Sequence, residues 1–284
     1  MLYKGRRQSS NIEDRRGMSA GRKVGVGGGI VTVIIALVVM LLGGDPREVL
    51  QMMETQQPAT EQVSDYQPSA HEQELTEFVS VTLADTEDVW HKLFENSGLT
   101  YREPTLVLFN SAVESACGFA QSATGPFYCP GDEKVYIDLN FLEELQQKLG
   151  AQGDFAVAYI VAHEVGHHVQ KQLGVLDQVH GLRGQVSEAA YNAQTVKLEL
   201  QADFYAGIWA HHAQKMKNIL EAGDIEEAMN AAQAVGDDRI QMQSRGYVVP
   251  DSFTHGTSQQ RMSWFRKGFS TGNVNNGDTF NEEI

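Results

Sequence analysis

The sequence predicts an α+β domain, mostly helical with a small β-sheet, preceded by one transmembrane helix. Three observations predict this class. Long stretches place apolar residues at helical spacing, two short apolar runs are typical of buried strands, and a 21-residue segment near the start carries no charge. Over 284 residues, 42% hydrophobic and 21% charged residues give an ordinary globular composition with ample material for a core.

The first part of the chain combines a basic arm with an apolar segment. Residues 1–23 hold seven Lys or Arg and two acidic residues, a net charge of +5. Residues 24–44 are uncharged, and about 1.5 Å per residue lets them cross a hydrocarbon core of about 30 Å. A cleaved signal peptide or a buried core helix would be the alternatives. The basic arm, the Gly run and the lack of a small-x-small cleavage site favour an uncleaved transmembrane anchor in a lipid bilayer.

The charge asymmetry predicts an orientation. The positive-inside rule keeps the arm in the cytoplasm and sends residues 45–284 across the membrane. Because the whole chain carries −15 and the arm +5, the remainder carries −20. A body of that sign repels phosphates, so the sequence predicts no binding of nucleic acid.

Cys117 and Cys129 are the only cysteines, and both are flanked by turn-forming residues. An even number of cysteines in an exported domain predicts a disulfide between them. Two unpaired thiols are the alternative, and a metal pair is disfavoured because the spacing lacks a CxxC pattern.

The elements follow in order. Residues 45–70 are rich in Gln, Thr, Ser and Pro, which predicts a flexible linker, and residues 71–272 form the folded domain. Residues 273–284 are polar and acidic and predict a disordered tail. Within the domain, short apolar runs predict strands at 105–109 and 135–139. Apolar periodicity predicts helices at 72–83, 86–96, 141–149, 154–173, 187–212, 224–235 and in the stretch leading to 269.

The helix predicted at 154–173 contains His-Glu-x-x-His. Residues four apart lie on one helical face, so His163 and His167 can present two imidazoles to one metal ion. Glu164 lies about 100° further round, beside the metal, where its carboxylate can take a proton from metal-bound water. The alternative is a pair of surface histidines. The pattern predicts a zinc hydrolase with Glu164 as the catalytic base.

A third ligand is predicted on the helix at 187–212. One face of it carries Glu199 and Asp203 among small residues, so another helix can approach closely. A carboxylate buried there must be paired or bound to metal, which makes Glu199 the third ligand. Asp203, one turn on, can hydrogen-bond the far ring nitrogen of a ligand histidine and so orient it. An exposed acidic surface is the alternative for this face, and the competing ligands are Asp203, His180, His211, His212 and His255.

His255 precedes Gly256 and Thr257 ahead of the last predicted helix. A histidine in such a loop can reach a cleft and donate to the oxyanion of a transition state, or it can be a capping or surface residue.

These residues carry a resemblance that covers most of the chain. The segments KGRRQSSNIEDRRG, SACGFAQSATGPFYCPGDEKVYIDLNF, VAHEVGHHVQ, LELQADFYAGIWA and THGTSQQRMSWF resemble the bacterial predicted neutral zinc metallopeptidases. The resemblance implies a zincin-like domain beside a small sheet, one zinc ion, and a single-pass location in the bacterial inner membrane with a periplasmic domain. It also implies a peptide or protein substrate.

The expected mechanism has zinc held by His163, His167 and Glu199, with Glu164 activating the zinc-bound water for hydrolysis of a peptide bond. The strand at 135–139 is expected to pair with an extended substrate. Two other functions fit the same motif: a membrane-anchored zinc-binding scaffold without proteolytic activity, and a zinc amidase that acts on a non-peptide component of the cell envelope.

Overall fold

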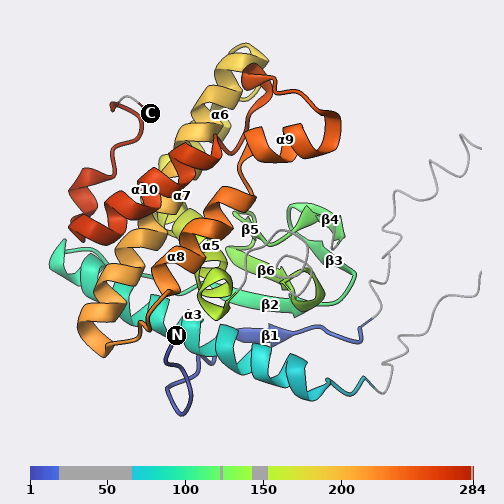
Figure 1. The fold of residues 1–284 in the computed structure, drawn as a ribbon, viewed down its shortest axis with the longest axis vertical. Helices are drawn as coiled ribbons and strands as arrows, with labels where there is room; N and C mark the ends of the chain where they lie inside the picture. The colour runs from blue at the N-terminus through green and yellow to red at the C-terminus, as the bar shows by residue number, and fades with distance from the viewer. Residues whose placement is uncertain (19–65, 122–123, 143–152, 283) are drawn as a thin grey trace, which may run out of the picture. The chain divides into compact units, whose positions relative to one another are not determined.

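The computed structural model describes residues 1–18, 66–121, 124–142, 153–282 and 284. Contacts divide the chain into two units, Arg16–Tyr66 and a compact unit of Met1–Arg15 with Gln67–Ile284. The second of these holds the helices and strands of the described residues (Figure 1). Its strands are β1 (Ile12–Asp14), β2 (Thr105–Phe109), β3 (Ala112–Ser115), β4 (Gly118–Gln121), β5 (Phe127–Cys129) and β6 (Lys134–Asp138). Its α-helices are α3 (Ala70–Asn96), α5 (Asp154–Gln172), α6 (Val175–Gly181), α7 (Glu188–Lys217), α8 (Asp224–Ala234), α9 (Asp237–Arg245) and α10 (Ser258–Thr271), and 3-10 turns lie at Pro250–Ser252 and Val274–Asn276.

The main sheet has four strands in the order β1, β2, β6, β5. β1 and β6 run parallel to β2, and β5 runs antiparallel to β6. Side chains alternate across β2: Leu106 and Leu108 join the main core, whereas Val107 and Phe109 join a smaller cluster on the other face. Burial on both faces explains why β2 is a continuous apolar run in the sequence.

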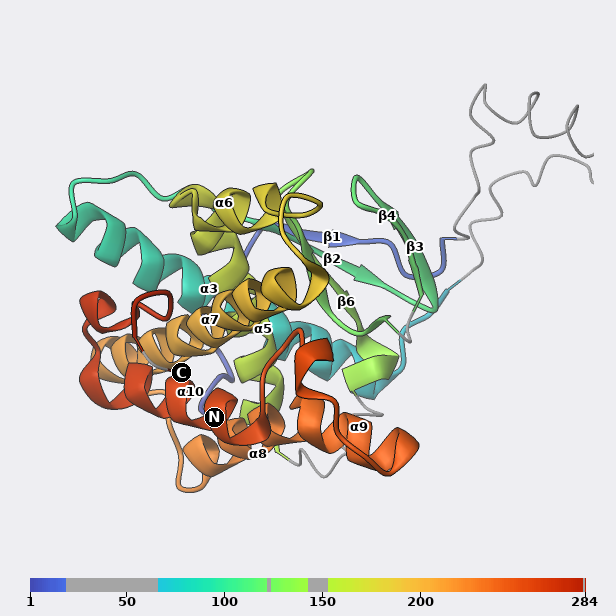
Figure 2. The same ribbon diagram turned by 90° about the horizontal axis from the view of Figure 1, so that it is seen from above.

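Helix α5 contacts β5 and β6 of the sheet and packs against α7 and α8, and α10 packs in turn on α7 and α8 (Figure 2). Residues from Phe155 to Gln170 are buried without interruption, so α5 is the central element of the core. One face of α5 carries a valine at every fourth position, and all of these valines are fully buried: Val157, Val161, Val165 and Val169.

The β3–β4 hairpin covers the second face of the sheet, where Val113 and Ala120 contact the cluster around Val107. The predicted disulfide between Cys117 and Cys129 is present and joins the hairpin turn to the end of β5. The disulfide therefore ties this hairpin to the outermost strand on that side of the main sheet.

Helix α3 is one continuous helix, whereas the sequence predicted a break at residues 84–85. The polar residues at that point are buried and paired, and do not end the helix. Asp85 Oδ1 accepts a hydrogen bond from Arg6 Nη2 at 2.7 Å, and Glu87 Oε2 accepts one from Arg7 Nη1 at 2.9 Å. The basic arm thus provides the partners that allow acidic residues inside a buried helix.

Residues 1–15 of the arm are part of the folded domain, contrary to the prediction that residues 1–23 lie in the cytoplasm, apart from a periplasmic domain. Its strand β1 pairs with β2 in the register Ile12 to Leu106, and Leu106 N donates to Asn11 O at 2.8 Å. Hydrogen-bonded strands of one sheet cannot lie on opposite sides of a bilayer. The predicted single-pass inner-membrane location, with its cytoplasmic arm, is therefore wrong.

The transmembrane helix in the predicted fold class is corrected as well. Among the residues described, none of the helices combines the length and the apolar character needed to cross a membrane. The predicted anchor at residues 24–44 and most of the linker predicted at 45–70 lie outside the described residues. The mixed helical domain with its small sheet is confirmed.

The chain also differs from the predictions near its C-terminal end. The segment predicted as a disordered tail packs onto the domain: Thr279 is buried and donates to Lys197 O at 2.7 Å, and Phe280 contacts the core. Helices α6 and α9 were not predicted, and residues 143–149 of the helix predicted at 141–149 lie outside the described residues.

Candidate metal centre

Helix α5 carries His163, Glu164 and His167 in the middle of its length. Its first turn begins with Asp154, and the backbone N–H of Phe155 is satisfied by Glu227 Oε2 of α8 at 3.0 Å. An acidic residue in the first turn and a paired N–H both stabilise the start of a helix.

Both histidines point to the same carboxylate on α7. His163 Nε2 lies 3.2 Å from Glu199 Oε2, and His167 Nε2 lies 3.4 Å from Glu199 Oε1. All three side chains offer one ligand atom within 4.8 Å of the others. The structure therefore brings together the three residues that the sequence predicts as ligands.

This donor set fits a zinc ion. Ligand atoms at about 2.0–2.1 Å from a tetrahedral metal lie about 3.4 Å from one another. The two measured nitrogen-to-oxygen distances, 3.2 and 3.4 Å, agree with that spacing. Neutral imidazole lone pairs facing carboxylate lone pairs repel each other unless a cation lies between them.

Protons can take the place of that cation. Burial lowers the pKa of His163, but the charge and hydrogen bond of Asp203 and the hydrogen bond to Glu199 outweigh it and raise the pKa to about 10. The pKa of His167 is also raised, because Glu199 outweighs the effect of burial. Burial raises the pKa of Glu199, yet His167 and His163 hold it well below its usual range. A metal ion that binds here must displace protons from the histidines.

Each ligand histidine has its own orienting partner on the far ring nitrogen. His163 Nδ1 donates to Asp203 Oδ1 at 2.8 Å, and His167 Nδ1 donates to Gln170 Oε1 at 2.9 Å. The Gln170 amide is fixed because its Nε2 donates to Leu198 O at 2.7 Å. Protons on both Nδ1 atoms leave both Nε2 atoms as ligands.

Glu164 lies beside this cluster and not within it. Its charge is among those that raise the pKa of His167, and its side chain is largely buried. None of the described residues donates a hydrogen bond to its carboxylate. Glu164 therefore lies next to the three candidate ligands and is not one of them.

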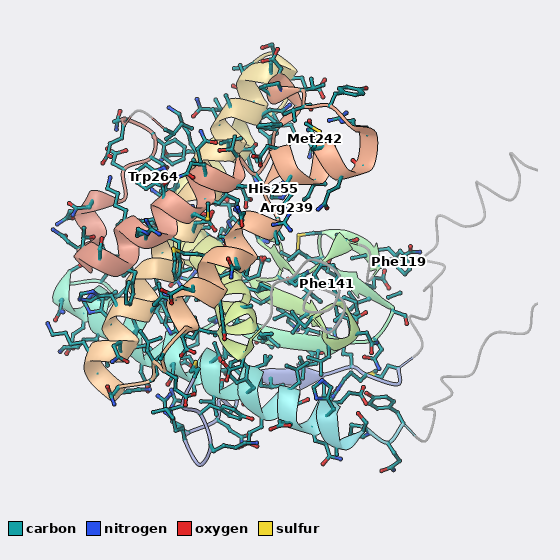
Figure 3. All side chains as sticks on the ribbon, in the orientation of Figure 1. Phe119, Phe141, Arg239, Met242, His255 and Trp264 are labelled. Atoms are coloured by element: carbon teal, nitrogen blue, oxygen red, sulfur yellow. A yellow bond between two sulfur atoms is a disulfide. The ribbon has the colours of Figure 1, made fainter. Side chains whose placement is uncertain are left out.

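His255 lies at the rim of the site, in the loop before α10 (Figure 3). About half of its side chain is exposed, and its Nδ1 lies 3.4 Å from Asp237 Oδ1. Its charge helps to lower the pKa of Glu199. The loop is fixed by Asp237 Oδ2, which accepts the backbone N–H groups of residues 254–256.

Close packing of α5 on α7 brings Glu199 to the histidines. A Cβ at Gly166 would lie 3.1 Å from Ala202 O and 3.2 Å from Ala202 Cα. The glycine inside the motif and the alanine that faces it let the two helix backbones meet closely, as the small residues around Glu199 predict.

Comparison with known proteins assigns the chain to a family. The profile of the family described as "Putative neutral zinc metallopeptidase" matches residues 1–280. The chain belongs to that family.

The chain is 49% identical over 292 residues to a protein of Escherichia coli K12 described as "Uncharacterized protein YpfJ", and the match covers 100% of both chains. It is 40% identical over 258 residues to uncharacterized proteins of Mycobacterium bovis and Mycobacterium tuberculosis, covering 85% of this chain and 84% of theirs. No solved structure matches the chain.

The candidate site also contains residues that the sequence did not predict. Tyr159, Gln170 and Arg261 surround the ligand histidines, and all three are buried. Tyr159 lies four residues before His163 and so on the same face of the helix, and this spacing could have indicated that Tyr159 belongs to the site. Arg261 comes from a distant helix and has no comparable signal in the sequence.

Other candidate residues lie elsewhere. His168 is fully buried and bridges Tyr128 and the backbone of Arg102. His211 and His212 contact backbone oxygens near the end of α10. A second acidic cluster, Asp154, Asp224 and Glu227, surrounds the N-terminal ammonium group, which lies 2.8 Å from Asp154 Oδ1. Among the described residues, the histidine and glutamate cluster on α5 and α7 is therefore the stronger candidate for zinc.

Proposed function

We propose that the protein is a zinc-dependent peptidase whose metal ligands are His163, His167 and Glu199. The single observation that carries the proposal is the convergence of both Nε2 atoms on the two oxygens of one carboxylate, at 3.2 and 3.4 Å, next to Glu164. A purely structural zinc site has no need of a nearby base, which favours an enzyme.

Bound zinc would polarise the scissile carbonyl and lower the pKa of the attacking water towards neutrality. Glu164 accepts the proton that the water loses and delivers it to the amine that leaves. His255, half-exposed at the rim, donates a hydrogen bond to the carbonyl oxygen as negative charge develops there. Asp203 and Gln170 hold the two ligand imidazoles in orientation.

The substrate strand is assigned to β5. The sequence predicted pairing along residues 135–139, but β6 already has β2 on one side and β5 on the other. The edge strands of the main sheet are β1 and β5, and β5 lies next to the motif's helix, because its Tyr128 contacts His168 of α5. An extended peptide that adds to β5 would run beside the helix that carries the motif.

The test measures zinc content and cleavage of an unfolded protein substrate by the full chain. Glu164→Gln removes the base but no ligand, so we expect full zinc content and a rate lower by about 100-fold or more. Glu199→Ala removes a ligand, and we expect loss of zinc. Glu188→Gln, an exposed residue at the start of α7, is the matched control and should keep both properties.

Two results contradict the proposal. One is a Glu164→Gln protein that cleaves at the wild-type rate. The other is a wild-type protein that binds zinc and leaves the unfolded substrate intact, as a scaffold or an amidase with a different substrate would.

A further inference from the structure

A buried guanidinium group lies directly behind the first ligand histidine. Arg261 of α10 donates from Nε to Asp203 Oδ2 at 2.8 Å and from Nη2 to Asp203 Oδ1 at 2.9 Å. Its side chain is only 4% exposed, and Nη2 lies 3.3 Å from His163 Nδ1. A two-point contact of this kind fixes the plane of a carboxylate as well as its position.

The Asp203 carboxylate of α7 is surrounded by donors from two other helices, α5 and α10. Besides Arg261, its Oδ1 accepts hydrogen bonds from Tyr159 OH at 2.5 Å and from His163 Nδ1 at 2.8 Å. Tyr159 OH itself accepts from Arg261 Nη2 at 3.2 Å. With both oxygens held in this way, the carboxylate cannot turn away from the imidazole.

Charge supports the same arrangement. Asp203 is fully buried, and an ionised carboxylate at such a position needs a positive partner. Arg261 supplies that charge permanently, because a guanidinium group keeps its proton in proteins. The second ligand histidine has no such pair behind it, since His167 is oriented by the neutral amide of Gln170.

We infer that Arg261, assisted by Tyr159, is a positioning residue that locks Asp203 against His163 and so fixes the Nε2 of that histidine as a metal ligand. The inference rests on the proposed zinc site and adds two residues to it. It gives the two ligand histidines different supports: a charged, three-helix network for His163 and a neutral amide for His167.

The close packing of α10 against α7 places Arg261 beside Asp203. Helices α7 and α10 cross at Gly207 and Gly268, where each glycine faces the backbone of the other helix. A Cβ at Gly268 would lie 2.1 Å from Phe204 O. This approach holds the helix of Arg261 against the helix of Asp203, which is the contact that the ion pair requires.

The test uses the full chain and two readouts of the metal centre other than activity. The first is the zinc dissociation constant measured by competition with a chelator, and the second is the visible absorption spectrum of the cobalt-substituted protein. Removal of an outer partner of a ligand histidine costs about 10–100-fold in metal affinity. We expect Arg261→Gln to weaken zinc binding by that factor and to alter the cobalt spectrum.

Two further variants separate positioning from general stability. Arg261→Lys keeps a positive charge but cannot span both carboxylate oxygens, so zinc affinity should recover in part. Arg266→Gln changes an exposed arginine of the same helix and should match the wild type in both readouts. If Arg261→Gln does not fold, Tyr159→Phe decides, because it removes one donor to Oδ1 and keeps the ring. That variant should bind zinc several-fold more weakly.

The outcomes distinguish this inference from the proposed function. In one outcome the wild type binds zinc and cleaves substrate, and Arg261→Gln, or Tyr159→Phe in its place, keeps the wild-type zinc affinity and cobalt spectrum. That outcome overturns only the role of Arg261. If the wild type binds no zinc, both are overturned.

Discussion

Replacement of Gly268 by Ala tests the helix crossing on which the arrangement of the site depends. The new Cβ would lie 2.1 Å from Phe204 O and 3.0 Å from Ile208 N. Both atoms belong to the backbone of α7, so no side-chain rotation relieves the contact. Because ordinary contacts of a Cβ begin near 3.4 Å, α10 must move away from α7 by more than 1 Å.

That displacement has two consequences. Overpacking of a buried contact costs about 1–3 kcal/mol of folding free energy. Arg261 lies on the moved helix, and its Nε starts 2.8 Å from Asp203 Oδ2, so a shift of 1 Å breaks the hydrogen bond. We therefore expect Gly268→Ala to lower both the stability of the protein and its affinity for zinc.

Urea denaturation of the zinc-free protein, followed by circular dichroism, measures the first effect, and chelator competition measures the second. Gly181→Ala is the control: it lies at the end of α6, and a Cβ there meets no atom within 4 Å. That variant should be as stable as the wild type, or more stable by up to about 1 kcal/mol. If Gly268→Ala unfolds at the same urea concentration as the wild type, the close helix approach and the reasoning built on it are refuted.

The pKa of His163 is raised to about 10 and that of His167 is raised, so both hold protons at neutral pH, and zinc must displace them. Zinc affinity should therefore increase with pH up to about 10. Calorimetry at pH 7 in buffers of different protonation enthalpy should show that zinc binding releases protons. If no protons are released, the raised pKa values of the two histidines are contradicted. Replacement of Cys117 and Cys129 by Ser opens a loop of 12-residue separation and should cost about 3 kcal/mol of stability; an unchanged urea midpoint contradicts the entropic argument. In hydrogen-exchange mass spectrometry, peptides from residues 12–15 should be as protected as those from β2, because Arg15 N donates to Leu108 O at 2.8 Å; exchange at the rate of an unfolded chain would show that the arm is not docked.

The metal cluster was predictable because its signal is periodic and local. His163 and His167 lie one turn apart on one helix, and Glu199 lies among small residues on a second helix. Arg261 was not predictable in the same way. A single arginine in a helix carries no periodicity, and only the tertiary packing of α10 on α7 shows that it is buried against Asp203.

The fold shows the same limit. The strand at 105–109 was predicted with its observed bounds because it is a continuous apolar run. The break predicted in α3 was wrong because Asp85 and Glu87 look like a polar interruption until Arg6 and Arg7 pair with them. Helix α9 is mostly polar and therefore lacks the apolar stripe that predicts a helix. It is held in place by Asp237 and Gln241, whose side chains accept hydrogen bonds from backbone N–H groups of the loop that follows.

The pairing of β1 with β2 also fixes an order of assembly on the ribosome. Ile12 faces Leu106, about a third of the chain further on, and at about 5–20 residues per second that distance takes roughly 5–20 s to synthesise. Partners so distant along the chain come together slowly even in the finished protein, because a long loop must close before any contact stabilises it. The strand that leaves the ribosome first is therefore among the last to find its neighbour, and Arg6 and Arg7, which precede it, likewise have no Asp85 and Glu87 to pair with until that part of α3 has been synthesised.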